Sequence, residues 1–169
     1  MAVRQVLSLP DRRLKRVASR AARAGQIDDA ARALAVDLLD TMRVSPACVG
    51  LAATQIGVAL RAVAVDVSGH TKARSCHGEF VLFDPELVDA RGSVLAREGC
   101  MSVPSLTGDV IRHDAVVVRG VSPDGEERVI AADAFEARAI QHELDHLDGL
   151  LFLDRVSSGD SVFRRKVYR

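Results

Sequence analysis

The hexapeptide QHELDH, at residues 141–146, is the most informative stretch of this sequence. It lies in a run of helix-forming residues that follows Asp133 and continues to Leu147. Asp133 and Glu136 have the three-residue separation of a capping box, and Gly149 stands just beyond the end of the run. These signals predict a helix that carries the hexapeptide.

Two histidines of the hexapeptide are placed to share one metal ion. His142 and His146 are four residues apart, so both imidazoles leave the same face of a helix, about one turn apart. Glu143 beside them can take a proton from water at such an ion. Chance and a pair of core histidines are the alternatives, but histidines next to acidic residues make a poor apolar face. The pattern therefore favours a metal site.

A hydrolytic metal site usually has three protein ligands and one open position, so a third ligand is expected. Cys100 lies in EGCMSVP (98–104), where glycine permits close backbone approach and Pro104 is expected to stop a strand. A lone cysteine, however, is more often a small buried apolar residue than a ligand. Position alone does not choose among the candidates, which are Cys48, Cys76, Cys100, His70, His77 and His113.

Outward from the hexapeptide, the sequence predicts one further helix and several strands. Apolar spacing predicts a helix over residues 28–43, with Asp28 or Asp29 as its N-cap and Ser45-Pro46 after its end. A turn signal at residues 122–125 predicts a hairpin. The expected strand segments cover residues 58–67, 80–94 with breaks at 84–85 and 91–92, 110–121 and 127–131. This order of elements favours an α+β fold.

Composition limits the functional classes. The chain has 169 residues, of which 48% are apolar and 27% charged, and its net charge is zero. These values predict one globular domain over residues 1–169 and no general attraction to nucleic acid or to an anionic membrane. No apolar run approaches the roughly 20 residues that a transmembrane helix needs. Three cysteines and no visible signal-peptide pattern favour a reducing cytoplasm, although the Arg-rich N-terminus faintly resembles an organellar transit peptide.

Three segments, in this order and at these separations, resemble the signature motifs of peptide deformylases. They are VGLAATQIG (49–57), EGCMSVP (98–104) and QHELDH (141–146). The connecting segments are similar as well, so the resemblance covers about residues 5–157 and leaves no room for a transit peptide. This family of metal hydrolases removes the N-formyl group from the initiator methionine of new polypeptides. The resemblance implies an α+β domain with antiparallel β-sheets around a central helix that bears the HExxH motif.

The resemblance also implies roles for individual residues. Glu143 would be the general acid and base, and Gln55 with the backbone N–H of Met101 would stabilise the oxyanion. The cofactor would be one divalent metal ion, Fe²⁺ ahead of Zn²⁺, since a thiolate with two imidazoles suits both. Its ligands would be Cys100, His142 and His146.

The peptide substrate would bind through its main chain. It would lie as an added strand beside Val49 and Gly50 and beside the segment around Gly99. The methionine side chain would contact Val49, Phe135 and the aliphatic stem of Arg138. Ordinary core packing is the alternative interpretation for Val49 and Phe135.

The chain departs from the first motif of the family at two positions. Cys48 stands where the family has glycine, and Thr54 stands where it has proline. Cys48 is therefore expected either to restrict the backbone or to crowd the substrate cleft, and Thr54 is expected to loosen the turn. Both changes would affect affinity and rate rather than the reaction. Met101 stands where leucine is commoner in the family. This change has no expected effect on the reaction if only the backbone N–H of Met101 takes part.

Two further features have a functional and a simpler interpretation. His70, Cys76 and His77 could form a second metal site, but a solvated loop is favoured because no ligand quartet has finger spacing. The basic C-terminal tail, residues 157–169, could contact ribosomal RNA. A solvated tail is favoured, because the longer C-terminal helix of the family is short or missing here.

Together these features predict the hydrolytic deformylation of N-formylmethionyl peptides. A deformylase-like amidase for another formylated or acylated amine is one alternative. A catalytically silent homologue that binds formyl-peptides or the ribosome is another, but the implied chemical groups are all present, which argues against it. The expected protein is a cytoplasmic monomer with transient ribosome contact, no specific nucleic acid and no membrane partner.

Overall fold

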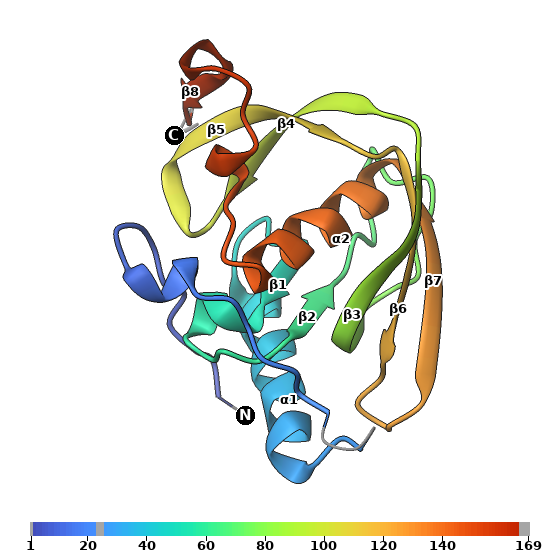
Figure 1. Ribbon diagram of the computed structural model, residues 1–169. Coiled ribbons are helices and arrows are strands. Elements are labelled where there is room, and N and C mark those ends of the chain that lie inside the picture. The colour runs from blue at the N-terminus through green and yellow to red at the C-terminus, as the bar shows by residue number, and fades with distance from the viewer. Residues whose placement is uncertain (1, 23–25, 166–169) are drawn as a thin grey trace.

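Helix α2 (Ala134–Leu147) lies between two antiparallel sheets (Figure 1). The structure, a computed structural model, describes residues 2–22 and 26–165. The larger sheet has the strand order β1-β2-β3-β6-β7 and the smaller sheet the order β4-β5-β8. The strands are β1 (Gly50–Ala52), β2 (Ala62–Val65), β3 (Phe80–Arg91), β4 (Val94–Cys100), β5 (Val103–Arg112), β6 (Ala115–Val121), β7 (Glu127–Asp133) and β8 (Val162–Arg164). This arrangement confirms the predicted α+β fold around the helix that bears the HExxH motif.

The larger sheet is covered on both faces, by α1 (Asp29–Val44) on one side and by α2 on the other. Strand β2 shows the consequence. Val63 and Val65 pack in the hydrophobic cluster that contains α2 residues, whereas Ala62 and Ala64 pack in the cluster that contains α1 residues. Because successive side chains point to opposite faces, a strand between two helices is apolar throughout.

Helix α1 forms as expected from its cap. The carboxylate of Asp28 accepts a hydrogen bond from the backbone N–H of Ala31 at 2.8 Å, so Asp28 and not Asp29 is the N-cap. Leu34, Leu38 and Met42 lie on the buried face of the helix. The prediction of a helix over residues 28–43 is confirmed to within one residue at each end.

The start of α2 differs from the expected capping box. The side chain of Asp133 caps no helical N–H, and its carboxylate instead accepts from the backbone N–H of Ser75 at 2.9 Å. Glu136 is completely buried and accepts from the hydroxyl of Ser75 at 2.6 Å and from the backbone N–H of His77 at 2.7 Å. The capping-box prediction is therefore wrong, because a loop distant in sequence supplies the donors. Gly149 follows the helix with φ +72°, as expected.

Several strand boundaries also differ from the expected ones, and the strand expected over residues 58–67 is limited to β2. Strand β3 continues through Asp84-Pro85 as a bulge, with a register shift between Phe83 and Glu86. The segment 110–121 divides after Arg112, because β5 and β6 belong to different sheets. Pro104 is the second residue of β5 rather than a strand stop. The hairpin at 122–125 is confirmed, since β6 and β7 pair on either side of it.

The segment after α2 folds back onto the smaller sheet. Short 3₁₀ helices at Phe152–Asp154 and Gly159–Ser161 lead to β8, which pairs with β5. A third 3₁₀ helix, at Arg12–Lys15, and a fourth, at Ala53–Ile56, lie nearer the N-terminus. The tail is therefore ordered rather than frayed as far as residue 165, although residues 157–160, 163 and 164 are exposed as expected, and residues 166–169 lie outside the described residues.

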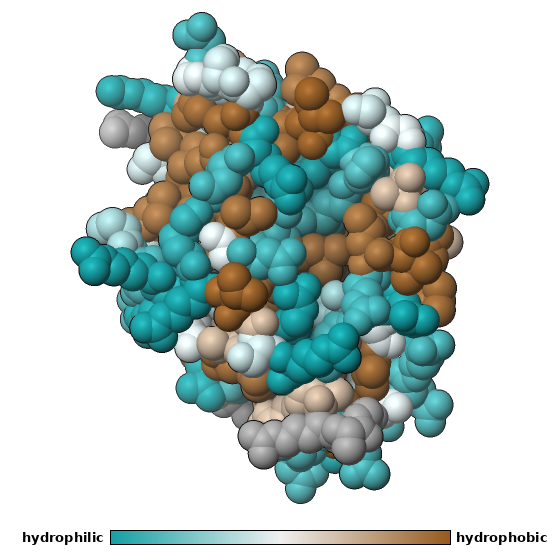
Figure 2. Space-filling model, viewed as in Figure 1, coloured by the Kyte–Doolittle hydropathy of each residue, from teal (hydrophilic) through white to brown (hydrophobic). Residues whose placement is uncertain are grey.

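The described surface is mixed in character. On the face shown in Figure 2, hydrophobic side chains lie in separate patches between hydrophilic ones. Within residues 2–22 and 26–165, no helix is both long and apolar enough to cross a membrane.

Candidate functional site

Three side chains from two elements converge beside the C-terminal half of α2. His142 and His146 leave this helix one turn apart, and Cys100 is the last residue of β4. Their ligand atoms all lie within 4.8 Å of one another, and this is the one such group found in the described part of the chain. The other candidates for the third ligand are Cys48, Cys76, His70, His77 and His113, and the structure brings none of them into this group.

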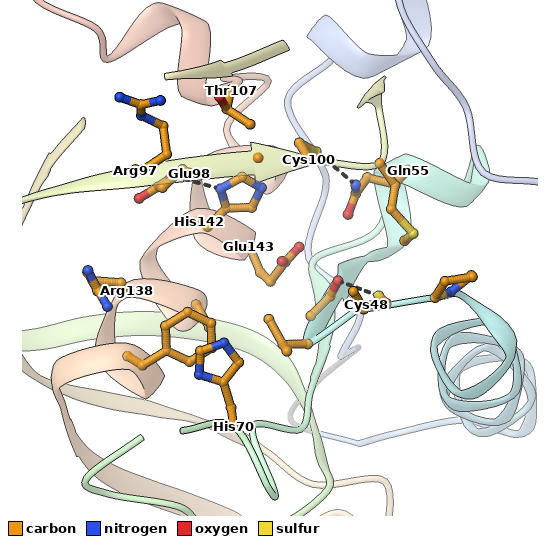
Figure 3. Close-up of a pocket in the computed structure, with 18 of the residues that line it drawn as sticks. Cys48, Gln55, His70, Arg97, Glu98, Cys100, Thr107, Arg138, His142 and Glu143 are labelled. Atoms are coloured by element: carbon orange, nitrogen blue, oxygen red, sulfur yellow. Dashed lines mark hydrogen bonds and ion pairs between the residues drawn. The ribbon is translucent and has the colours of Figure 1, made fainter. Parts of the chain in front are cut away.

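The thiol of Cys100 is held by groups from three segments. Its Sγ lies 3.2 Å from Nε2 of His146 and accepts from the backbone N–H of Ser102 at 3.4 Å. The side-chain amide of Gln55 donates to the same sulfur at 3.5 Å and to the hydroxyl of Ser102 at 3.1 Å. The other end of that amide, Oε1, accepts from the backbone N–H of Ala52 at 2.9 Å. The NH₂ group of Gln55 is thereby turned toward the cluster (Figure 3).

A buried chain of charges orients His142. Nδ1 of His142 lies 2.9 Å from Glu98, whose two oxygens also accept from Arg112 at 2.8 and 3.0 Å. Arg112 in turn donates to Asp145 at 2.5 Å, and Asp145 accepts two bonds from Arg155. Burial alone would raise the pKa of Glu98, but the bonds from Arg112 and His142 hold it at about 2. With Nδ1 engaged in this way, Nε2 of His142 is left to bind a ligand.

The donor set fits a divalent metal ion. Thiolate and imidazole ligands suit Fe²⁺ and Zn²⁺, and an outer carboxylate on a ligating histidine is the usual support. Burial lowers the pKa of His146 well below its usual range, which keeps this imidazole neutral as a ligand must be. Two buried polar atoms beside the cluster, Oε2 of Glu143 and Nδ1 of His146, have no hydrogen-bond partner in the described structure. The carboxylate oxygen of Glu143 lies where a further group can complete the site, whereas Nδ1 of His146 is on the side of the ring away from Nε2, which faces Cys100.

Glu143 lies at the centre of the site, between His142 and the first motif (Figure 3). Burial raises the pKa of its carboxyl group to about 7. The carboxyl group can therefore both hold and release a proton near neutral pH. A side chain at Gly50 would place its Cβ 2.5 Å from Oε1 of Glu143, so only glycine leaves the carboxylate room at this position.

These groups open into a cavity of about 520 Å³. The cavity is lined by all five residues expected to bind substrate, which are Val49, Gly50, Gly99, Phe135 and Arg138. Gln55, Met101 and Glu143 line it too, together with the metal-site residues Cys100 and His142. The structure thus brings the expected binding and chemical residues to one cleft.

Several residues of this cleft, including His70, were not expected there from the sequence. The imidazole of His70 stacks on the ring of Phe135, with the ring centroids 3.6 Å apart and the planes 2° from parallel. Arg97, Thr107 and Arg165 line the opposite side. No motif marked these positions, because strands and loops that are distant in sequence bring them together.

The suggested second metal site does not form among the described residues. His70 stacks in the cleft, Nδ1 of His77 lies 2.9 Å from Glu136, and Cys76 is exposed. The solvated-loop interpretation that was favoured for this segment fits only in part, because His70 and His77 both contact residues of α2.

The two departures in the first motif have local explanations. The thiol of Cys48 lines the cleft and donates to the carbonyl oxygen of Gly50 at 3.1 Å, and burial raises its pKa to about 12. Cys48 therefore narrows the cleft as a neutral thiol. Thr54 is buried, and its hydroxyl donates to the carbonyl oxygen of His146 at 3.1 Å. This hydrogen bond holds the turn against α2 and so opposes the greater backbone freedom that was expected from threonine in place of proline.

Comparison with known proteins adds an independent finding. A family model described as polypeptide deformylase matches residues 3–162. The peptide deformylase of Syntrophobacter fumaroxidans is 40% identical over 167 residues, which cover 98% of this chain and 94% of that protein. A peptide deformylase structure from Legionella pneumophila has a TM-score of 0.82 at 36% identity and covers 92% of this chain and 87% of its own. A peptide deformylase structure from Ehrlichia chaffeensis, in complex with actinonin, has a TM-score of 0.85 at 31% identity. The match covers 95% of this chain and 92% of the Ehrlichia chain.

Proposed function

This chain belongs to the polypeptide deformylase family, and from that premise we propose how its residues remove the N-formyl group from the N-terminal methionine of newly made polypeptides, releasing formate. The observation that carries the proposal is the cluster of Cys100, His142 and His146 beside Glu143, at the wall of a cleft. A peptide end can enter such a cleft, whereas the buried cluster excludes most of the solvent.

We assign the metal site to Cys100, His142 and His146, and we propose Fe²⁺ as the resident ion with Zn²⁺ as the alternative. The mixed sulfur and nitrogen donors support both ions. When bound, the ion supplies Lewis-acid chemistry, which lowers the pKa of a coordinated water and polarises a carbonyl group. The contribution of the chain is to fix the donors, since Glu98 orients His142 and the backbone of Ser102 orients Cys100.

Glu143 moves the proton. Its pKa of about 7 allows it to accept a proton from the attacking water and to pass it to the departing amine. Its unpartnered oxygen, Oε2, is free to make these contacts within the described site. No other carboxylate that lines the cleft is available, because both oxygens of Glu98 are engaged by Arg112.

Gln55 and the backbone N–H of Met101 stabilise the oxyanion that develops on the formyl oxygen. The amide of Gln55 is preorganised, because Ala52 holds its oxygen and leaves its NH₂ group toward the cleft. A preorganised donor needs no reorganisation during the reaction and lowers the barrier by on the order of 3 kcal/mol. We therefore expect Gln55→Ala to lower kcat by about 10²-fold, with KM and metal content nearly unchanged.

The peptide binds as an added strand beside Val49, Gly50 and Gly99. Glycines at these edges let the main chain approach closely. The methionine side chain lies against Val49, Phe135 and the stem of Arg138, which line one side of the cavity. Residues 1–169 act as one catalytic domain in this proposal.

The cellular setting is part of the proposal. Formylmethionyl chains arise on ribosomes, which supports a cytoplasmic location and transient contact with the ribosome. We propose a monomer without a specific nucleic-acid site, since the net charge of the chain is zero.

The test is formate release by protein that has been purified without oxygen and assayed for bound metal. Formyl-Met-Ala-Ser and acetyl-Met-Ala-Ser are compared, each with and without a chelator. Formate from the formyl peptide alone, lost with the chelator, is the expected result. Cleavage of the acetyl peptide at a similar rate would favour a broader amidase. No reaction from folded, metal-loaded protein would contradict the proposal.

The ligand assignment has its own test. Cys100→Ser should lower the metal content of the purified protein. An unchanged metal content would mean that another residue is the third ligand.

A further inference from the structure

The last described residue of the chain reaches the substrate cleft. Strand β8 pairs with β5, with Phe163 opposite Thr107, and the backbone N–H of Arg165 continues this pairing by donating to Ser105 at 2.9 Å. Side chains alternate along a strand, so Phe163 and Arg165 share one face of the smaller sheet and Arg164 points to the other. Arg165 lines the cavity, whereas Arg164 is exposed and does not.

The guanidinium group of Arg165 lies over the edge where the peptide is proposed to bind. It is 3.5 Å from the carbonyl oxygen of Cys100, and any side chain at Gly99 would collide with it. The strand edge at Gly99 is where the residues that follow methionine would run. An incoming peptide therefore meets this guanidinium directly.

Among the described residues, the charge of Arg165 has no carboxylate partner. Arg97, the neighbouring guanidinium in the cleft, is paired with Asp109 at 2.5 Å and lies over the ring of Phe163. Arg165, by contrast, makes no ion pair with any of the residues that the structure describes. Of the carboxylates that line the cleft, Glu98 is engaged by Arg112 and Glu143 is assigned to proton transfer. Within the described cleft, a carboxylate on the peptide would therefore be the ion-pair partner of Arg165.

We propose that Arg165 is a specificity-determining residue that favours substrates with a carboxylate side chain in the first two residues after methionine. This inference rests on the proposed deformylase function and on the added-strand binding mode. A solvent-accessible charge pair of this kind gives at most about fivefold in affinity, and salt weakens it. The preference should therefore appear in KM rather than in kcat, and it should decline as ionic strength rises.

The experiment compares peptides that differ only in charge. The probes are formyl-Met-Glu-Ser-amide and formyl-Met-Ser-Glu-amide, each beside its glutamine counterpart, so that no terminal carboxylate contributes. We expect the wild-type protein to show a higher kcat/KM, by up to about fivefold, for at least one glutamate peptide at low salt. Arg165→Gln should bring that ratio close to one. Arg164→Gln is the matched control, because it removes the same charge from the same strand but not from the cleft, and it should keep the ratio.

Three results would overturn the proposal. One is a wild-type protein that does not distinguish glutamate from glutamine at either position. Another is a glutamate preference that survives Arg165→Gln. The third is an equal rise in kcat/KM for all peptides in Arg165→Gln, which would make Arg165 a group that blocks the cleft.

A binding measurement separates this inference from the deformylase function. For the unformylated peptides Met-Glu-Ser-amide and Met-Ser-Glu-amide, the dissociation constants of the glutamate and glutamine forms are determined by calorimetry on wild-type protein and on both variants. Their ratio reports the role of Arg165 without turnover. Absence of formate release from formyl-Met-Ala-Ser would instead count against the function alone.

Discussion

Adjacent residues of α2 differ sharply in how well their polar atoms are satisfied. Asp145, which faces the charge chain, has both oxygens engaged by Arg112 and Arg155. Glu143, which lines the cleft, and His146, which is buried in the cluster beside it, each keep one buried atom without a partner in the described structure. An unpaired buried polar group costs roughly 1–3 kcal/mol, so the cleft side is held at the expense of stability. The contrast indicates that the charge chain fixes the helix while the cleft side keeps its capacity for a ligand and a substrate.

The largest effect is expected from Glu143→Gln, which alters only the cleft side. The amide has the same shape but cannot take up the proton, so kcat should fall by up to about 10⁴-fold. Metal content should stay at the wild-type level, because the three proposed ligands are untouched. Formate release and metal analysis on the same sample check both points. A rate near that of the wild-type protein would remove the general-base role.

The next largest effect is expected from Arg112→Met, which interrupts the buried charge chain on the other side of α2. Removal of this buried guanidinium leaves the carboxylates of Glu98 and Asp145 without their common partner, and the free energy of unfolding should fall by about 3–5 kcal/mol. Arg119→Met is the matched control, because Arg119 pairs with Glu86 at the surface and should cost under about 1 kcal/mol. Chemical denaturation measures both. Equal losses would mean that the buried chain contributes no more than a surface pair.

A pH dependence follows from Glu143 in the metal-free protein. Its pKa is about 7 when folded and 4.5 as the reference value, so the folded state binds the proton more tightly. This carboxyl group therefore reduces stability as pH rises from about 4.5 to about 7. At pH 8, Glu143→Gln should be more stable than the wild-type protein by at most about 3 kcal/mol, and at pH 4 the two should agree. Denaturation of both chelator-treated proteins across this range tests it, and a constant difference would contradict the shifted pKa.

These residues also show what the sequence could and could not reveal. The helix, its two histidines and Glu143 follow from spacing along one element, and Cys100 and Gln55 were identified by motif resemblance. The charge chain was not predicted, because Glu98 on β4, Arg112 on β5 and Arg155 after α2 meet only through sheet pairing and helix packing. The capping box failed for the same reason, since a distant loop engages Glu136.

A smaller effect is expected from Glu98→Gln, which weakens the contact between the charge chain and the cleft side of α2. Glu98 contacts both Arg112 and His142, so its loss of charge disturbs the orientation of a proposed metal ligand. Metal affinity should fall by about 10- to 100-fold. Competition with a chelator of known affinity measures this, with Glu86→Gln at the surface as the control. An affinity equal to that of the control would show that His142 is held without its carboxylate.

The smallest effect is expected where the first motif joins α2. Thr54→Val keeps the shape of the side chain and removes its bond to the carbonyl oxygen of His146, which also accepts from the backbone N–H of Gly149 at 3.2 Å. Because that oxygen keeps a partner, the loss of stability should be only about 1 kcal/mol. Thr71→Val, at an exposed position, should change stability by less than about 0.5 kcal/mol. If Thr54→Val also lowers kcat while Thr71→Val does not, the bond positions Gln55 in addition to stabilising the turn. If neither variant changes stability, the hydroxyl of Thr54 does not compensate for the proline that it replaces.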